Sequence, residues 1–192
     1  MVDINRRAVL AGTGALAGVT LAACNTPQIP NPLHTKSATI DARVDQTLSQ
    51  MYAEYPKTRP IAARSAGMLV MPLITEAGLG LGGGFGRGAL RIGGVSVEYY
   101  SATKANFGIQ IGANQYAHVL FFMTEDALAD FRQSDGWAAG AEVDASFLSG
   151  GETLGTDTAT AMSPVVGIIF GQAGVRLGAT LEGTKYSRIR AQ

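Results

Sequence analysis

The chain has 192 residues, of which 46% are apolar, and 15 Lys and Arg residues balance 15 Asp and Glu residues. This length and composition predict one folded domain with a buried core and exclude a disordered chain. A non-specific nucleic-acid binder needs a basic surplus to displace counterions from phosphates, so the zero net charge argues against nucleic acid as a partner. The single Cys excludes an intramolecular disulfide and a cysteine-rich zinc site.

The first 23 residues resemble the export signal of a bacterial lipoprotein. Arg6 and Arg7 precede an uncharged run, residues 8–23, which is shorter than the roughly 20 apolar residues that span a bilayer. The run ends Leu21-Ala22-Ala23-Cys24, which resembles a lipobox, in which the thiol receives a diacylglycerol. We therefore expect residues 1–23 to be a signal peptide and Cys24 to be the lipidated first residue of the mature chain. The Arg6-Arg7 pair favours twin-arginine export, with Sec export as the alternative.

The segment after Cys24 is expected to tether the folded part to a membrane. Asn25 resembles the residue found in lipoproteins that are passed on to an outer membrane, so we expect the protein to face the periplasm from that membrane. Pro27, Pro30 and Pro32 bias their neighbours away from helix and predict an extended tether over residues 24–36. The folded domain is then expected over residues 37–192.

Three helices are expected in this domain. Apolar residues at helical spacing, from Ile40 to Tyr55, predict an amphipathic helix that begins near Ser37 and ends before Pro56. A short second helix is expected over residues 60–67. Thr124 is a suitable N-cap for a third helix, which ends near Ser134.

The rest of the domain is expected to be mostly strand. A short apolar strand, residues 68–71, is predicted to end at Pro72, and residues 119–123 are apolar on both faces, as in a central strand. Turn residues at 112–115 predict a hairpin before that strand, and residues 107–111 alternate as a half-buried strand does. Further strands are expected near residues 140–148, 165–170 and 174–182. The fold class is therefore α+β, a single domain with a curved, barrel-like antiparallel sheet and a few packed helices.

A glycine-rich segment interrupts the strands. Nine of the nineteen residues 76–94 are Gly, and Gly78 to Gly83 contains a formal Gly-x-Gly-x-x-Gly match to phosphate-binding loops. No helical period follows to supply the dipole that such a loop needs. We therefore favour glycines that let strands bend, bulge or pack closely over the alternative of nucleotide binding.

No catalytic or metal-binding constellation is found. His34 and His118 are the only histidines, one in the tether and one in a predicted strand, and no cofactor is expected. We expect His118 to be packed in the core. An enzyme would require a deep pocket in which a carboxylate approaches His118.

Several blocks of sequence resemble the SYLF lipid-binding domain family, over about residues 37–189. The blocks occur in order: Ala66-Gly67-Met68-Leu69-Val70-Met71-Pro72, residues 86–90, residues 107–113, Phe121-Phe122-Met123-Thr124, Trp137 followed by residues 140–143, and residues 178–183.

The resemblance implies a binding domain rather than an enzyme. Eukaryotic members associate with phosphoinositide-containing membranes and in some cases with actin, and bacterial members are exported proteins. Ala66 replaces a Lys that many relatives have, and Arg43 is matched by Asp41 and Asp45, so the resemblance does not extend to phosphoinositide selectivity.

The sequence thus favours a lipid-anchored, non-catalytic envelope protein whose SYLF-like domain binds phospholipid or a membrane surface. Arg59, Arg64, Arg87 and Arg91, near the glycine-rich segment, are the candidate lipid-headgroup residues. The alternative is a structural or interaction lipoprotein that holds another envelope protein.

Overall fold

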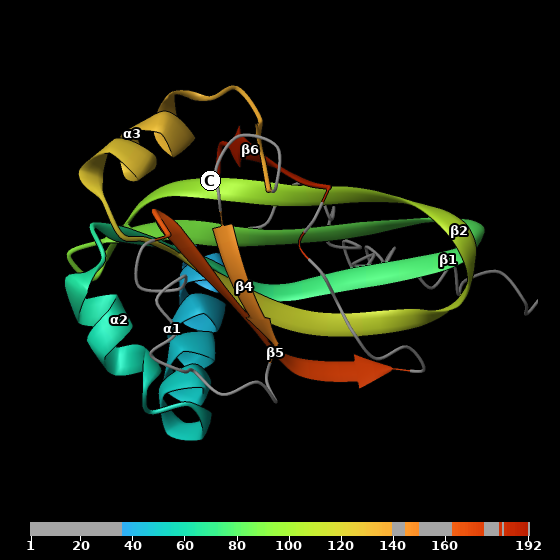
Figure 1. Ribbon diagram of the computed structural model, residues 1–192, viewed down its shortest axis with the longest axis horizontal. Coiled ribbons are helices and arrows are strands. Elements are labelled where there is room, and N and C mark those ends of the chain that lie inside the picture. Colours follow the sequence, from blue (N-terminus) through green and yellow to red (C-terminus); the bar gives the residue numbers. More distant parts are fainter. Residues whose placement is uncertain (1–35, 140–144, 150–162, 175–180, 182, 192) are drawn as a thin grey trace, which may run out of the picture. The chain divides into compact units, whose positions relative to one another are not determined.

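The computed structural model describes residues 36–139, 145–149, 163–174, 181 and 183–191. These residues form one α+β domain of three helices and a curled sheet (Figure 1). The expected signal peptide and lipobox, including Arg6, Arg7 and Cys24, lie outside the described residues, as does His34.

The three predicted helices are confirmed. They are α1 (Ser37–Glu54), α2 (Thr58–Arg64) and α3 (Glu125–Gln133). The Thr124 side chain accepts a hydrogen bond from the Ala127 amide at 3.1 Å, which satisfies one of the free donors at the start of α3. The apolar stripe of α1 buries Ile40, Val44 and Met51, as its spacing predicts.

Two long strands replace the several short ones expected in the first half of the sheet. β1 (Gly67–Ile92) and β2 (Val95–Phe122) form an antiparallel hairpin. Pro72 does not end β1 as expected, because the register shifts between Met71 and Ile74, and a bulge tolerates the missing amide donor. The turn expected at 112–115 is also wrong. The chain turns instead at Gly93 and Gly94, whose φ values of 58° and 82° suit a two-residue hairpin turn.

The remaining strands lie along β2. Its first half pairs with β6 (Thr184–Ile189) and its second half with β5 (Val165–Gly174). β3 (Trp137–Ala138) pairs with β6, and β4 (Ala145–Ser149) pairs with β5. The predicted antiparallel sheet is confirmed except at one place, because β4 and β5 are parallel. β3 and β6 were not expected from the sequence.

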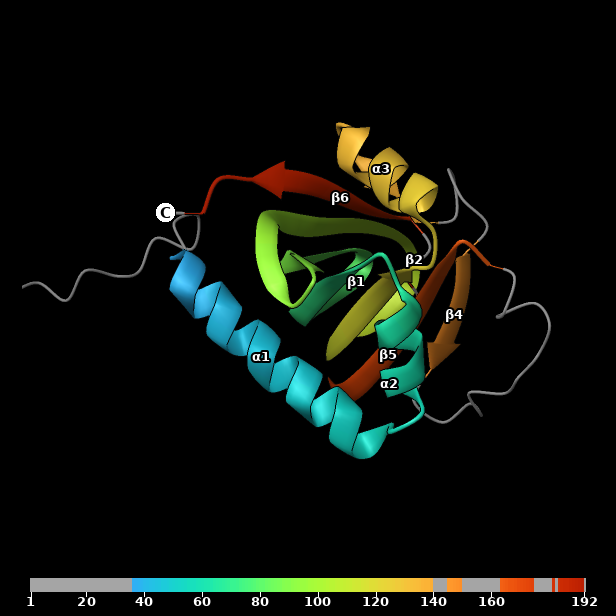
Figure 2. The same cartoon turned by 90° about the vertical axis from the view of Figure 1, so that its left-hand side faces the viewer.

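Glycines allow the hairpin to fold back on itself. A Cβ atom on Gly88 would overlap the carbonyl oxygen of Val70, and one on Gly86 would overlap the carbonyl oxygen of Leu73. The two halves of β1 therefore approach closely, and the sheet curls into a half-barrel (Figure 2). The Gly-x-Gly-x-x-Gly match lies inside β1 with no helix after it. Within it, a Cβ atom on Gly82 would lie 2.9 Å from the carbonyl oxygen of Ala77, so close strand packing accounts for this glycine.

The curled sheet buries both of its faces. Figure 2 shows α1 on one side of the curled strands and α3 on the other. The concave face packs against α3 in an aromatic core, and the convex face packs against α1. The concave core includes Leu69, Leu120, Phe122, Phe131, Trp137 and Tyr186, and the convex core includes Val44, Met51, Val70, Val119 and Phe170.

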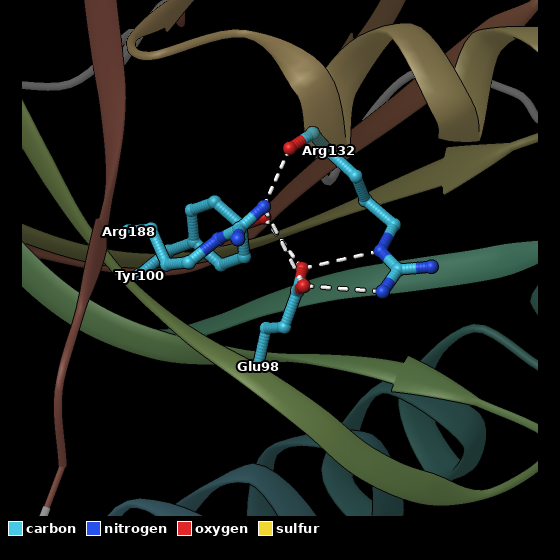
Figure 3. Close-up of polar contacts among 4 residues, drawn as sticks. All are labelled: Glu98, Tyr100, Arg132 and Arg188. Carbon is cyan, nitrogen blue, oxygen red and sulfur yellow. Dashed lines mark hydrogen bonds and ion pairs between the residues drawn. The ribbon is translucent and has the colours of Figure 1, made fainter.

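A charged cluster fastens α3 and β6 to β2 (Figure 3). Arg132 donates to both carboxylate oxygens of Glu98, at 3.2 and 3.1 Å, and Arg188 lies 3.5 Å from the same carboxylate. The Tyr100 hydroxyl donates to Glu98 at 2.8 Å. Burial raises the pKa of Glu98, but the hydrogen bonds and the two guanidinium charges outweigh burial, so this pKa lies below its ordinary value.

Candidate functional site

A groove of about 260 Å³ lies between α1 and the outer side of β1. One wall comes from the first two turns of α1, and the other comes from both halves of β1. Its lining is Ile40, Arg43, Pro72, Leu73, Thr75, Phe85, Gly86 and Arg87.

The close approach within β1 creates the apolar part of this groove. Because Gly86 has no side chain, the two halves of β1 can pack together, which brings Leu73 and Phe85 into the same groove. Both side chains remain open to solvent, at 42% and 45% exposure, whereas Ile40 is buried at 2%. Two large apolar side chains are thus left beside open space.

Hydrogen bonds and an ion pair fix the face that α1 turns toward the sheet. Asp41 accepts hydrogen bonds from Ser96 at 2.7 Å and from Tyr99 at 2.9 Å. Asp45 pairs with Arg91 at 2.7 Å. Burial and the hydrogen bond to Asp41 raise the pKa of the Tyr99 hydroxyl, so Tyr99 stays a neutral donor at physiological pH.

Arg43 lies on the other side of α1 from these two acids. It is two residues from each, and two residues turn an α-helix through about 200°. The acids contact the sheet and Arg43 lines the groove, so they do not form ion pairs with it. Within the described part of the chain, no hydrogen bond or ion pair of Arg43 is found.

Arg87 supplies the second positive charge of the groove. Its guanidinium lies 5.1 Å from the centre of the Phe85 ring, over the ring face. Such a cation–π contact holds the charge next to the apolar part of the groove. The groove therefore combines two guanidinium groups with an apolar lining, which suits a ligand that is both anionic and apolar.

The structure separates the four arginines expected at a lipid headgroup. Arg87 lines the groove, whereas Arg91 is paired with Asp45 and is not part of the lining. Arg59 lies 4.7 Å from the centre of the Tyr52 ring, and Arg64 donates to the carbonyl of Pro60 at 3.3 Å. Both belong to α2, which contributes no residue to the groove. Headgroup binding by these residues remains a prediction.

Sequence reasoning missed Arg43 as a site residue. The i, i+4 spacing of Asp41 and Asp45 places them on one helix face, and Arg43 between them falls on the opposite face. This spacing could have predicted that Arg43 lies on a different face of α1 from the two acids. The fold-back of β1 brings residues 72–75 next to residues 85–87. Apart from its glycine content, the sequence contains no pattern that predicts this fold-back.

His118 is packed in the concave core, as expected. It is fully buried, and its Nε2 lies 2.8 Å from the Tyr186 hydroxyl. Burial and the nearby charge of Lys104 lower the pKa of His118 to about 3, so the ring is neutral at physiological pH. No carboxylate contacts His118 within the described residues, and the groove lies on the opposite face of the sheet.

The described residues contain no group of three or more His, Cys, Asp and Glu side chains that could hold a metal ion. No helix among them is long and apolar enough to cross a membrane.

Comparison with known proteins gives one family. Residues 103–191 match the family Ysc84, described as Las17-binding protein actin regulator. No curated protein matches the chain. The matched segment contains part of β2 and all of α3, β3, β4, β5 and β6, whereas every groove residue lies between positions 40 and 87. The family match therefore covers the second half of the sheet and α3 but none of the groove residues. The groove has to be interpreted from its own geometry.

Proposed function

Residues 103–191 belong to the Ysc84 family of SYLF-like domains, and from this premise we propose that the domain binds anionic phospholipid at a membrane surface through the groove between α1 and β1. The family is of the binding type and is known for actin and lipid binding, not for catalysis. Its description names Las17 binding and actin regulation. The groove favours lipid, because it joins positive charge to exposed apolar side chains.

The single observation that supports the proposal is the composition of the groove. Arg43 and Arg87 line the same space as Leu73 and Phe85, which are 42% and 45% exposed. An anionic membrane attracts each nearby basic residue by about 1 kcal/mol, and the attraction weakens with salt. With equal numbers of acidic and basic residues in the whole chain, binding has to depend on such a local patch rather than on net charge.

The proposal includes an exported, lipid-anchored location that faces the periplasm, at the outer membrane. It rests on residues 1–23, on Cys24 and on the proline-containing tether. The tether leads into α1 at Ser37, and two groove residues, Ile40 and Arg43, follow within the first turns of that helix. A lipid on Cys24 would thus keep the groove near a membrane surface, because an extended tether of this length reaches at most about 40 Å.

Vesicle co-sedimentation tests the binding step. The probe is the mature chain from residue 24 with Cys24→Ser, which removes the anchor, and the vesicles contain phosphatidylglycerol or phosphatidylcholine. We expect weak, salt-sensitive binding to phosphatidylglycerol alone. Replacing Arg43 and Arg87 together by Ala should lower the affinity about ten-fold or more, from the loss of about 1 kcal/mol per residue.

A matched variant shows whether the groove carries the binding. Replacing Arg59 and Arg64 by Ala removes the same charge from α2, outside the groove, and should have a smaller effect. Equal losses in the two variants would contradict a role for the groove. If the unchanged chain stays in the supernatant with every anionic lipid, including phosphatidic acid and cardiolipin, lipid binding is wrong and the interaction lipoprotein takes its place.

Cell fractionation tests the location separately. Cys24→Ser should move the protein from the membrane to the soluble fraction, because acyl chains bind a membrane by about 0.8 kcal/mol per buried CH₂. Replacing Arg6 and Arg7 by Lys should block export if the twin-arginine pathway reads the guanidinium pair. Unchanged export would indicate Sec, and it would leave the lipidation proposal intact.

A further inference from the structure

We infer that the groove binds the acyl chain of one anionic amphiphile, with the charged end of that molecule at Arg43 and Arg87. The inference rests on the proposed function, because it assigns the ligand of the same groove. It goes beyond membrane-surface binding, since it requires a single molecule with a chain of methylene groups to enter the protein.

The concave shape of the apolar lining is the first reason. A planar layer of headgroups can contact protruding arginines, but it cannot displace water from a groove of about 260 Å³. Pro72, Leu73 and Phe85 line this space, and the last two are nearly half exposed. A flexible methylene chain can fill it and remove these apolar surfaces from water.

The position of the charges is the second reason. Arg43 comes from α1 and Arg87 from β1, so the positive groups approach from both walls of the groove. A guanidinium binds a carboxylate or a phosphate through paired hydrogen bonds. A fatty acid and a phosphate monoester lipid both present such an anion at one end of a chain.

Charge complementarity selects a lipid over a neutral apolar occupant. The two acids nearest to Arg43 on α1 contact the sheet instead, through Ser96 and Arg91. The groove lining itself contains two basic residues and no acidic residue. An anionic end of the ligand would complement these two positive side chains in the lining.

Isothermal titration with soluble alkyl anions tests the inference. The protein is the mature chain with Cys24→Ser, and the ligands are hexanoate, octanoate, decanoate and decyl phosphate below their micelle concentrations. Each added CH₂ that enters the groove should raise the affinity about four-fold. Inorganic phosphate should bind far more weakly than decyl phosphate, and a neutral decyl glycoside should bind more weakly than decanoate.

Groove variants locate the binding. Leu73→Gln and Phe85→Gln keep an exposed residue at each position, and each should lower decanoate affinity about ten-fold or more through lost apolar contact. Val95→Gln is the matched control, because Val95 is 64% exposed and lies outside the groove lining. Circular dichroism and urea unfolding show whether each variant is folded. If one groove variant fails to fold, the other still tests the binding.

The outcomes separate this inference from the proposed function. Vesicle binding together with no chain-length dependence would overturn the inference and leave membrane-surface binding in place. Chain-length-dependent binding that Leu73→Gln weakens would support the inference even if vesicles are not bound, in which case membrane-surface binding is wrong. If an acidic peptide with one Phe competes as well as decanoate does, the lipid assignment is overturned in favour of a protein partner.

Discussion

On the concave face of the sheet, Glu76 pairs with Lys104 at 3.2 Å and accepts a hydrogen bond from Tyr116 at 2.7 Å, away from solvent. On the convex face, Arg43 and Arg87 lie beside an open groove with two exposed apolar side chains. The same sheet thus has charged groups of two kinds. One kind is paired within the core, and the other borders a space that a ligand can enter.

This difference shows which charges are structural. A buried ion pair costs desolvation free energy that its attraction repays only when further hydrogen bonds are present, as the Tyr116 hydroxyl provides for Glu76. Removing either partner would leave a buried charge and should destabilise the fold. Arg43, at the edge of the groove, has no hydrogen bond or ion pair within the described residues, so its removal should affect binding far more than stability.

The largest loss of stability is expected from a substitution that disturbs the close approach of the two halves of β1. Gly88→Ala places a Cβ atom on the carbonyl oxygen of Val70, so the two halves of β1 have to separate. We expect a loss of about 3 kcal/mol or more in the free energy of unfolding, as for strained or overpacked core sites. Urea unfolding monitored by circular dichroism measures it.

Gly83→Ala is the control on the same strand. Its Cβ would lie 3.2 Å from the carbonyl oxygen of Lys104, a contact that a small shift can relieve. The loss should therefore be clearly smaller than for Gly88→Ala. Equal stability of the Gly88→Ala variant and the unchanged chain would show that β1 does not fold back as described.

The next effect concerns the buried histidine of the concave face. His118 has a pKa of about 3 in the folded state against an ordinary value of 6.5, so between these values the unfolded chain takes up a proton that the folded chain does not. Stability should therefore fall as the pH drops below about 6, by about 1.4 kcal/mol per pH unit from this residue. The loss should be absent above about pH 7.

The variant His118→Gln should remove this dependence. Its free energy of unfolding, measured in urea at pH 7, 6 and 5, should change with pH by about 1.4 kcal/mol per unit less than that of the unchanged chain. The comparison uses slopes, so it holds even if the variant is less stable at every pH. Parallel slopes would contradict a neutral, buried His118.

A smaller effect is expected at the charged cluster shown in Figure 3. Glu98→Gln leaves Arg132 and Arg188 next to one another without the carboxylate that joins them. We expect a loss of about 1–2 kcal/mol, since both arginines are partly exposed and solvent screens them.

This loss should depend on pH in a defined direction. The pKa of Glu98 is lowered in the folded state, so its stabilisation is fully present above the ordinary value of 4.5 and disappears as the pH falls through the lower folded value. The difference between Glu98→Gln and the unchanged chain should then shrink below about pH 4.5. Glu125→Gln, at the exposed start of α3, is the control and should lose about 0.5 kcal/mol or less.

The helices and the fold class could be predicted because their signals are local. The stripe from Ile40 to Met51 has a helical period, and Thr124 followed by acidic residues marks a helix start. The length of β1 could not be predicted, since Pro72 reads as a strand end and becomes a bulge only when β2 pairs alongside it. β6 was missed because Thr184–Ile189 has alternating burial set by its partner rather than by a clear apolar pattern.

The candidate site could be predicted only in part. Arg87 was among the expected headgroup residues, and the close packing of glycines was expected as well. What joins Arg87 to Arg43 is the placement of α1 across the folded-back strand, which depends on Asp41 and Asp45 contacting residues about 50 positions away. Such long-range contacts leave no periodic signal in one sequence.

The smallest effect on stability, and the sharpest test of the comparison between the two faces, is expected for Arg43→Ala. Arg43 is exposed and has no hydrogen bond or ion pair within the described residues, so the free energy of unfolding should change by no more than about 0.5 kcal/mol. Binding to phosphatidylglycerol vesicles should nevertheless fall about five-fold, which corresponds to about 1 kcal/mol for one basic residue near an anionic surface. Arg91→Ala gives the opposite pattern, because it breaks the 2.7 Å pair with Asp45 outside the groove lining, and it should lower stability more than Arg43→Ala while changing vesicle binding less. If Arg43→Ala destabilises the fold as much as Arg91→Ala does and leaves vesicle binding unchanged, Arg43 has a structural role as Arg91 does, and the groove loses its role as the ligand site.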